Sequence, residues 1–352
     1  MSRRGALIGI RKSRERGFSL IELTIAVAIL GAIFAITGPA INSALTMMEG
    51  AKRDETVLNN QKLASGMMAF ARNSNNGRLP APFTGDGVHS GLYDPSDDSA
   101  AGQALSLELR NTGVPVNAIN SDSAIVENVK VYRRVAGLSY VMPLYFTTGS
   151  PVTLTYDVGS ITQTRCPKSN SCNSGTPGAS PAMNTGNVTS WVQVDPDFGA
   201  IVFSTLPEQK NMLRLTTARI NKLTDRLTSE FYTRMRLAAA NSTQNFYPAP
   251  NNAGAPNLAG RNPNSFMGCH DGWYRLNAPN VNVLAQLGLD PNEFGITPWG
   301  GAIEYCRDYE PSGASSATAD TAPHYAALRF NRNLSAAGVP TNVPANDIVV
   351  TF

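Results

Sequence analysis

The longest apolar segment of the chain lies near its beginning. Residues 18–36 read FSLIELTIAVAILGAIFAI, and Glu22 is the only charged side chain in this run. A helix of this length is close to that needed to cross a bilayer. After Pro39 the pattern stays helical but becomes amphipathic. Its apolar residues recur at three- to four-residue steps or small multiples of them, namely Ile41, Leu45, Met48, Val57, Ala64, Met67 and Ala71.

The end of this first helix is marked by polar residues and helix breakers. Residues 73–77 read NSNNG, and residues 79–82 read LPAP, where the prolines prevent the helix from resuming. We therefore expect one helix from about Phe18 to about Arg72. Its second half is expected to pack on a globular head.

Residues 83–205 have the pattern of loops and short strands. Alternation of β-branched or aromatic residues predicts strands at 129–135, 138–146 and 151–158, and in part of 191–203. Residues 169–184 are small and polar and contain Pro and Gly, which predicts an exposed loop.

A second helix is expected over residues 206–240. Its apolar stripe at helical spacing consists of Leu213, Ile220, Leu223, Leu227, Phe231 and Met235. The other face is basic and carries Arg214, Arg219, Lys222, Arg226, Arg234 and Arg236. A basic stripe can bind DNA or a membrane surface, but this one lacks interleaved aromatic residues on which bases could stack. We interpret it as a core helix with a solvated face, and nucleic acid is not a favoured partner.

The region after the second helix repeats a feature of the first. Residues 241–245 read NSTQN and residues 247–250 read YPAP, which resembles the NSNNG and LPAP that follow the first helix. We hypothesise two similar α+β lobes in tandem, which one continuous sheet through both halves would contradict. The expected divisions are a leader at 1–17, a helix at 18–72 with its assembly segment at 18–39, a first head at 73–205, and a second helix with a C-terminal head at 206–352. The last strand is expected at 347–352.

Composition and charge describe a globular body behind a basic leader. The chain is 42% hydrophobic and 16% charged, and its 30 Gly and 23 Pro favour loops and strands. Residues 1–17 contain six of the 29 basic side chains and one acid, so the remainder, at 23 basic against 25 acidic residues, is near −2. A body with this charge has no general attraction to nucleic acid. The basic cluster before the apolar run predicts that residues 1–17 stay cytoplasmic.

Glu22 distinguishes the apolar run from an ordinary anchor. A carboxylate in the membrane costs several kcal/mol unless it is neutralised or paired, so its position marks a site. A cleaved secretory signal also has a basic region before an apolar one, but an acid inside it is unusual. A plain single-span anchor leaves Glu22 unexplained, and a core helix of a soluble protein fits the basic flank worst.

Residues 16–23, which read RGFSLIEL, resemble the processing site of type IV prepilins and type II secretion pseudopilins. The resemblance implies that a prepilin peptidase cuts after Gly17 and N-methylates Phe18. Glu22 then becomes the fifth mature residue, and Gly31 and Pro39 fall where the family commonly has glycine and proline. Residues 296–305, ITPWGGAIEY, are similar to a Pro-Trp-Gly turn and strand in pilin heads.

The family implies a structural role and no catalysis. An N-terminal helix would assemble with those of other pilin subunits, and the Phe18 amine of one subunit would pair with Glu22 of a neighbour. Gly31 would allow close helix approach, and Gly31 and Pro39 would bracket a segment that can bend. The expected location is the inner membrane before assembly, with a cytoplasmic N-terminus, and then a periplasmic or extracellular filament. The chain's length favours a minor or tip subunit with a possible surface receptor; a secretion pseudopilin and a single-span periplasmic binding domain are the alternatives.

Other candidate chemistry is sparse. The four cysteines, Cys166, Cys172, Cys269 and Cys306, permit three pairings, of which we favour Cys166–Cys172 and Cys269–Cys306 because each closes a local loop. Zinc held by these cysteines and His270 lacks a known ligand spacing. Calcium could bind a group of acids that does not match a calcium loop, Asp86, Asp94, Asp97 and Asp98. No catalytic or phosphate-binding motif occurs, and no cofactor is expected.

Overall fold

A computed structural model describes most of the chain. The described residues are 20–82, 100–119, 129–143, 151–164, 183–193, 198–251, 261–262, 267–311, 322–334, 338–341, 343 and 345–352. Near the N-terminus, the backbone is described from Leu20, but the side chains of 20–23, 26 and 29–41 are not. The chain divides into two compact units, residues 1–56 and residues 57–352.

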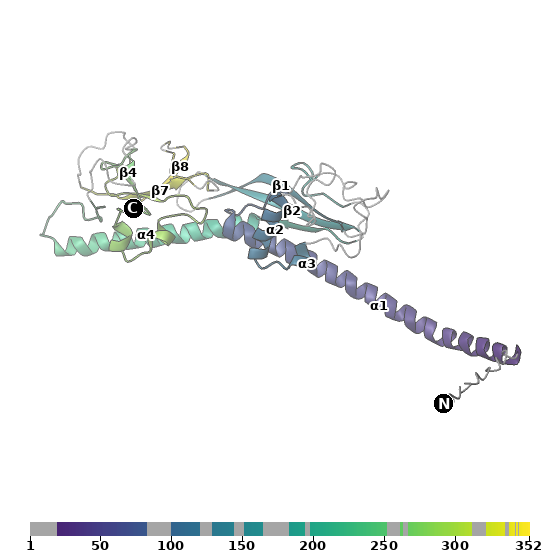
Figure 1. Cartoon of the computed structure of the whole chain (residues 1–352). Coiled ribbons are helices and arrows are strands. Elements are labelled where there is room, and N and C mark those ends of the chain that lie inside the picture. Colours follow the sequence, from purple (N-terminus) through teal and green to yellow (C-terminus); the bar gives the residue numbers. More distant parts are fainter. Residues whose placement is uncertain are drawn as a thin grey trace, which may run out of the picture. The chain divides into compact units, whose positions relative to one another are not determined.

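Helix α1 spans Leu20–Ser74 and contributes to both units (Figure 1). It ends in the NSNNG segment, as expected from the sequence. Asn76 and Gly77 have positive φ angles of 50° and 75°, and the amide of Gly77 donates to the carbonyl of Ala71 at 2.7 Å. Left-handed residues of this kind, Gly above all, satisfy the last carbonyls of a helix and turn the chain away.

The first sheet of the described chain has the order β1-β2-β3, with all pairs antiparallel; β1 and β2 are labelled in Figure 1. Its strands are β1 (Val129–Met142), β2 (Val152–Thr164) and β3 (Ile201–Ser204). The two strands expected at 129–135 and 138–146 are one strand with a register shift between Val135 and Leu138. Gly137 has φ +77° there, which is the geometry of a β-bulge. Among the described residues of the region 191–203, the strand begins only at Ile201.

Two helices correct the expectation of loops and strands in the middle region. Helix α2 spans Ala100–Asn111, and the short α3 spans Val116–Ile119. The leucines of α2 alternate at 105, 107 and 109, which is the spacing of a strand. Only some of them can therefore face the core of a helix: Leu109 is fully buried, whereas Leu107 is 55% exposed.

The first sheet and the second half of α1 share a core. On α1, Leu63, Met67 and Ala71 are buried and belong to one cluster with Tyr132 of β1 and Ile161 of β2. The three α1 residues recur at four-residue steps, so they form one face of the helix. The expected packing of the second half of α1 on a globular body is therefore observed within residues 57–352.

The second sheet has the order β4-β5-β6-β7-β8 and is also antiparallel. Its strands are β4 (Arg261–Asn262), β5 (Trp273–Arg275), β6 (Glu304–Cys306), β7 (Ala327–Asn331) and β8 (Asp347–Thr351). The short helices α5 (Val283–Gln286) and α6 (Pro291–Phe294) precede β6. The last strand is thus formed at the place that the sequence predicts.

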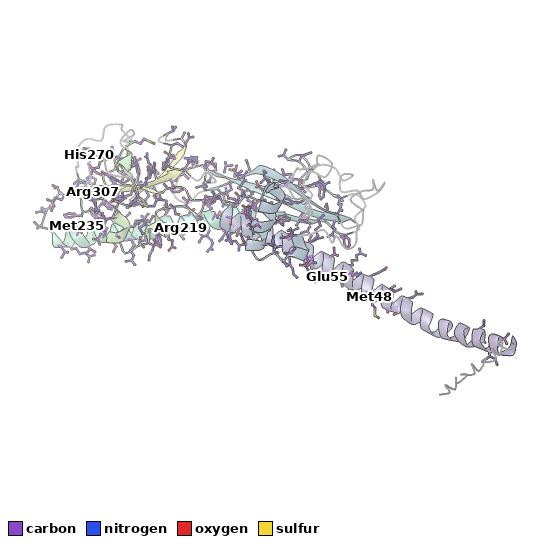
Figure 2. All side chains as sticks on the ribbon, viewed as in Figure 1. Met48, Glu55, Arg219, Met235, His270 and Arg307 are labelled. Atoms are coloured by element: carbon purple, nitrogen blue, oxygen red, sulfur yellow. A yellow bond between two sulfur atoms is a disulfide. The ribbon has the colours of Figure 1, made fainter. Side chains whose placement is uncertain are left out.

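Helix α4 spans Leu206–Leu237 and packs on the second sheet. Most of its predicted stripe is buried in one large cluster, including Ile220, Leu223 and Leu227. The same cluster contains Val152 and Leu154 of β2, so the start of β2 also contacts this core. Met235 corrects the prediction: it is 42% exposed, because the stripe continues beyond the end of the buried surface (Figure 2).

The two sheets are separate among the described residues, and each has its own helix. The single continuous sheet that would have contradicted two tandem lobes is absent from this part of the chain. Both lobes nevertheless belong to one compact unit, residues 57–352. The proposed domain boundaries and the origin by duplication stay predictions.

Candidate assembly site

The residues expected to direct processing and assembly lie at the edge of the described structure. Gly17 and Phe18 precede the first described residue. Glu22, Gly31 and Pro39 lie within the helical backbone of α1, but their side chains are outside the described residues. The backbone is therefore helical at all three positions. The pairing role expected for Glu22 stays a prediction.

Beyond these residues, α1 exposes large apolar side chains in the unit formed by residues 1–56. Ile25 and Val27 are 53% and 62% exposed, and Met47 and Met48 are 73% and 59% exposed; Met48 is labelled in Figure 2. Leu45, which the pattern of the sequence included in an amphipathic stripe, is 53% exposed as well. Exposed large apolar side chains that lie close together, as those of Leu45, Met47 and Met48 do along the helix, are typical of an interaction surface. Other helices that covered these residues would remove them from water.

A charged segment separates this apolar surface from the head. Lys52, Arg53, Asp54 and Glu55 are all exposed, as the sequence predicts for a solvated face; Glu55 is labelled in Figure 2. The first deep contact of α1 with the sheet follows at Asn60. Its side-chain amide donates to Gln163 Oε1 of β2 at 2.8 Å, and both side chains are buried.

Among the residues that the structure describes, no helix is long and apolar enough to cross a bilayer.

The segment after α1 is fixed by Asp157 of β2, which sequence reasoning did not single out. Its carboxylate accepts from the amides of Leu79 and Gly137 at 3.0 Å each, and it forms an ion pair with Arg78 at 3.1 Å. One buried side chain therefore holds both the LPAP segment and the bulge of β1. A second link is Gln209 of α4, which donates to the carbonyl of Gly77 at 2.8 Å and accepts from Trp299 Nε1 at 2.8 Å.

The turn around Trp299 lies in the core between α4 and the second sheet. The indole is fully buried, and Gly300 has φ +80°, so the turn requires a residue without a side chain. The resemblance to a Pro-Trp-Gly turn thus falls on a position that packs the head. Its bond to Gln209 connects the turn to the end of α1.

The second pair of cysteines forms a disulfide. Cys269 and Cys306 are bonded with a Cα–Cα distance of 5.8 Å, and both are buried beside Trp273. This is one of the two pairings favoured from the sequence. Both thiols are consumed, so the zinc site considered with His270 is not available there. Cys166 and Cys172 lie outside the described residues.

A buried ion pair lies in the second sheet. Arg329 of β7 contacts Glu304 of β6 at 2.6 Å, and neither side chain is exposed. The guanidinium also lies over the ring of Trp273, 4.4 Å from its centroid. Burial raises the pKa of Glu304, and the charge of Arg329 opposes that shift. Burial likewise lowers the pKa of Arg329, and Glu304 opposes it.

The basic residues of α4 do not form one open surface. Arg219, labelled in Figure 2, donates to the carbonyl of Ile296 at 2.8 Å. Arg234 donates to Glu230 at 2.7 Å and to Gln286 at 3.1 Å. Others, such as Arg214 and Lys222, are exposed. This distribution agrees with a core helix that has a solvated face.

No group of three or more His, Cys, Asp or Glu side chains that could hold a metal occurs among the described residues. The calcium candidates Asp86, Asp94, Asp97 and Asp98 lie outside that set. His270 is described, and His89 is not.

With this geometry in place, the comparisons identify the N-terminal segment. Residues 12–38 match the prokaryotic N-terminal methylation motif, which is the signature of type IV pilins and pseudopilins. The chain therefore carries the N-terminal signature of a class of structural subunits. The matched range contains Gly17, Phe18, Glu22 and Gly31, and it ends one residue before Pro39. Neither the comparison with curated proteins nor that with solved structures gave a match.

Proposed function

We propose that this chain is a minor or tip subunit of a type IV pilus or a related filament. The observation that carries the proposal is the methylation motif at residues 12–38. It is supported by α1, which continues as a helix from Leu20 to Ser74, and by the exposed apolar side chains on its first part. A peptidase would cut after Gly17 on the cytoplasmic side and methylate Phe18.

Assembly follows from the chemistry of the new N-terminus. Cleavage leaves an amine at Phe18, four residues before Glu22. In a bundle of parallel helices, this amine pairs with Glu22 of a neighbouring subunit. Each charge is costly alone in hydrocarbon, so the pair favours the assembled state and fixes the stagger between subunits. Exposed residues such as Met47 and Met48 would then contact neighbouring helices.

The minor or tip position rests on the size of the head. At 352 residues, with two separate sheets in the described part, the head offers surface in addition to that of the N-terminal helix. That surface is available for a receptor or for starting assembly. Quantification of subunits in purified filaments should find this chain as a small fraction of the total. Filaments made mainly of this chain would refute the minor position.

Substitution of Glu22 tests the assembly mechanism. We expect Glu22→Ala to reduce the amount of this chain in sheared filaments by tenfold or more, because the neighbour's amine loses its partner. Glu49→Ala is the matched control, since Glu49 is an exposed acid of the same helix outside the apolar run. Equal incorporation of the two variants would contradict the pairing role.

A pseudopilin of a type II secretion system is the second candidate, because the matched motif is shared by both classes. The two differ in their phenotype. Deletion of a pseudopilin stops the export of folded proteins, whereas deletion of a pilus subunit changes surface filaments. A single-span anchored binding domain instead predicts an uncleaved chain that tolerates Glu22→Ala.

A further inference from the structure

A groove lined mainly by polar residues lies where the start of β2 meets the end of β7 and the residues just before β8, within the unit of residues 57–352. Its volume is about 520 Å³, which is within the range of small-molecule sites. It is lined by Pro151, Thr153, Thr155, Asn331, Arg332, Asn333, Thr341 and Asn346. These residues come from both sheets, so the groove is a product of their joining.

The first wall of the groove follows from the alternation of β2. Val152 and Leu154 point to the core and are 0% and 1% exposed, so Thr153 and Thr155 face the other side. The strand therefore presents two hydroxyl groups on one face, while the side chains of its other face are buried in the core. A rigid strand of this kind holds polar groups in fixed positions.

The second wall consists of residues 331–333, Thr341 and Asn346, and hydrogen bonds to backbone amides hold it in place. The amide of Asn333 donates to Asn331 Oδ1 at 2.8 Å, and the amide of Arg332 donates to the carbonyl of Asn346 at 2.7 Å. Thr341 is fixed by Asp347, whose Oδ1 accepts from the backbone and the hydroxyl of Thr341 at 2.8 and 3.1 Å. These hydrogen bonds fix the backbone at Arg332, Asn333 and Thr341, from which lining side chains project.

Arg332 gives the groove a positive charge. Arg332 is partly buried, and its Nε is fully buried and has no hydrogen-bond partner among the described residues. Arg329, three residues earlier, shows the contrast because it is paired with Glu304 at 2.6 Å. A buried guanidinium N–H without a partner favours an anionic oxygen. A carboxylate can accept two hydrogen bonds from one guanidinium group.

We propose that this groove binds an acidic saccharide, with the sugar carboxylate on Arg332. Three side-chain amides and three hydroxyls line the rest of the groove. The side chains of Thr153, Thr155 and Asn346 can both donate to and accept from sugar hydroxyls, whereas the Thr341 hydroxyl already donates to Asp347 Oδ1. Among the described residues that line the groove, Pro151 alone is apolar, so this lining lacks the pockets that would select apolar side chains of a peptide. The inference goes beyond the proposed function because it depends on the groove and not on filament assembly.

Calorimetric titration of the full chain in mild detergent micelles tests the proposal. The probes are the disaccharide of glucuronic acid and N-acetylglucosamine, a sialic-acid disaccharide, and the carboxyl-reduced form of the first. We expect saturable binding of an acidic probe that weakens at least about tenfold when its carboxyl is reduced. Arg332→Gln should weaken that binding by a similar factor and abolish the preference for the acid.

Two further variants separate the groove from general effects of charge. Arg226→Gln removes an exposed guanidinium of α4 outside the groove and should leave binding unchanged. Thr153→Val keeps the shape of the side chain and should weaken the acidic and the reduced probe by the same factor. Equal binding by Arg332→Gln and the unaltered chain would overturn the proposal, as would the absence of binding to both acidic probes at millimolar concentration.

Tighter binding of a tetrapeptide containing two glutamates than of either saccharide would overturn the assignment to saccharides. Failure of the filament proposal is distinguishable from these outcomes. A chain that binds the saccharide but retains residues 1–17 in its native membrane would refute the filament proposal and leave the groove assignment intact.

Discussion

Asp157 concentrates several contacts of the first lobe in one buried carboxylate. Its oxygens accept from the amides of Leu79 and Gly137 and bind Arg78. Asp157→Asn would turn an amide NH₂ toward at least one of these donors and remove the charge that pairs with Arg78. We expect a loss of about 2–4 kcal/mol in the free energy of unfolding, measured by denaturant titration of the full chain. Asp225→Asn, on the exposed face of α4, is the control and should leave the midpoint unchanged.

The ion pair of Glu304 and Arg329 gives a second prediction at the residue scale. Glu304→Ala leaves a buried guanidinium without its carboxylate and should destabilise the fold by about 3–5 kcal/mol. The double substitution Glu304→Leu with Arg329→Met removes both charges and should recover part of that loss. Thermal unfolding of the three chains measures the effect. A double variant that is less stable than Glu304→Ala would show that the ion pair adds net stability beyond the cost of burying its two charges.

Single residues differ in how far the sequence could reveal them. Glu22 stands out because a charge interrupts an apolar run, and the Cys269–Cys306 pairing follows from a short loop closure. Asp157 and Arg332 have no such signal. Each is an ordinary polar residue in the sequence, and its role arises from partners, or their absence, that only the folded chain brings together.

At the scale of elements, two glycines of α1 test how the helix meets the head. Gly66 is buried, and an added Cβ would overlap Val114 Cγ2, so Gly66→Ala must displace the segment between α2 and α3. We expect a net loss of about 1–2 kcal/mol in global stability. Gly50 is exposed and has open space around it, so Gly50→Ala should stabilise the helix by about 0.5–1 kcal/mol.

The two glycine substitutions are measured differently because the residues lie in different units. Global unfolding reports on Gly66→Ala, and hydrogen exchange of the amides around residue 50 reports on Gly50→Ala. Effects of the same sign at both positions would show that helix propensity, and not the contact with Val114, decides the outcome at Gly66.

Elements with a clear period were predictable, and elements with a misleading one were not. The stripe of α4 repeats at helical steps, so its position followed from the sequence. Helix α2 was not predicted, because its leucines lie at alternate positions, which is the spacing of a strand. The two strands expected on either side of Gly137 are one strand, because a bulge held by Asp157 lets the ladder continue through the glycine.

At the scale of the whole molecule, the chain combines two different surfaces. The unit of residues 1–56 exposes apolar side chains on a helix, and the unit of residues 57–352 buries two cores and displays a polar groove. The first suits contacts between subunits, and the second suits a soluble ligand. The sequence predicted the apolar helix. It could not predict the groove, because the groove forms only where β2 packs against β7 and β8.

The most direct test of the account is the N-terminus of the protein in its native membrane. Intact mass and N-terminal sequencing should show a chain that begins at N-methylated Phe18. That result would establish processing by the prepilin route. A chain that keeps residues 1–17, or one cut beyond Pro39, would contradict the assignment to a pilus-type filament.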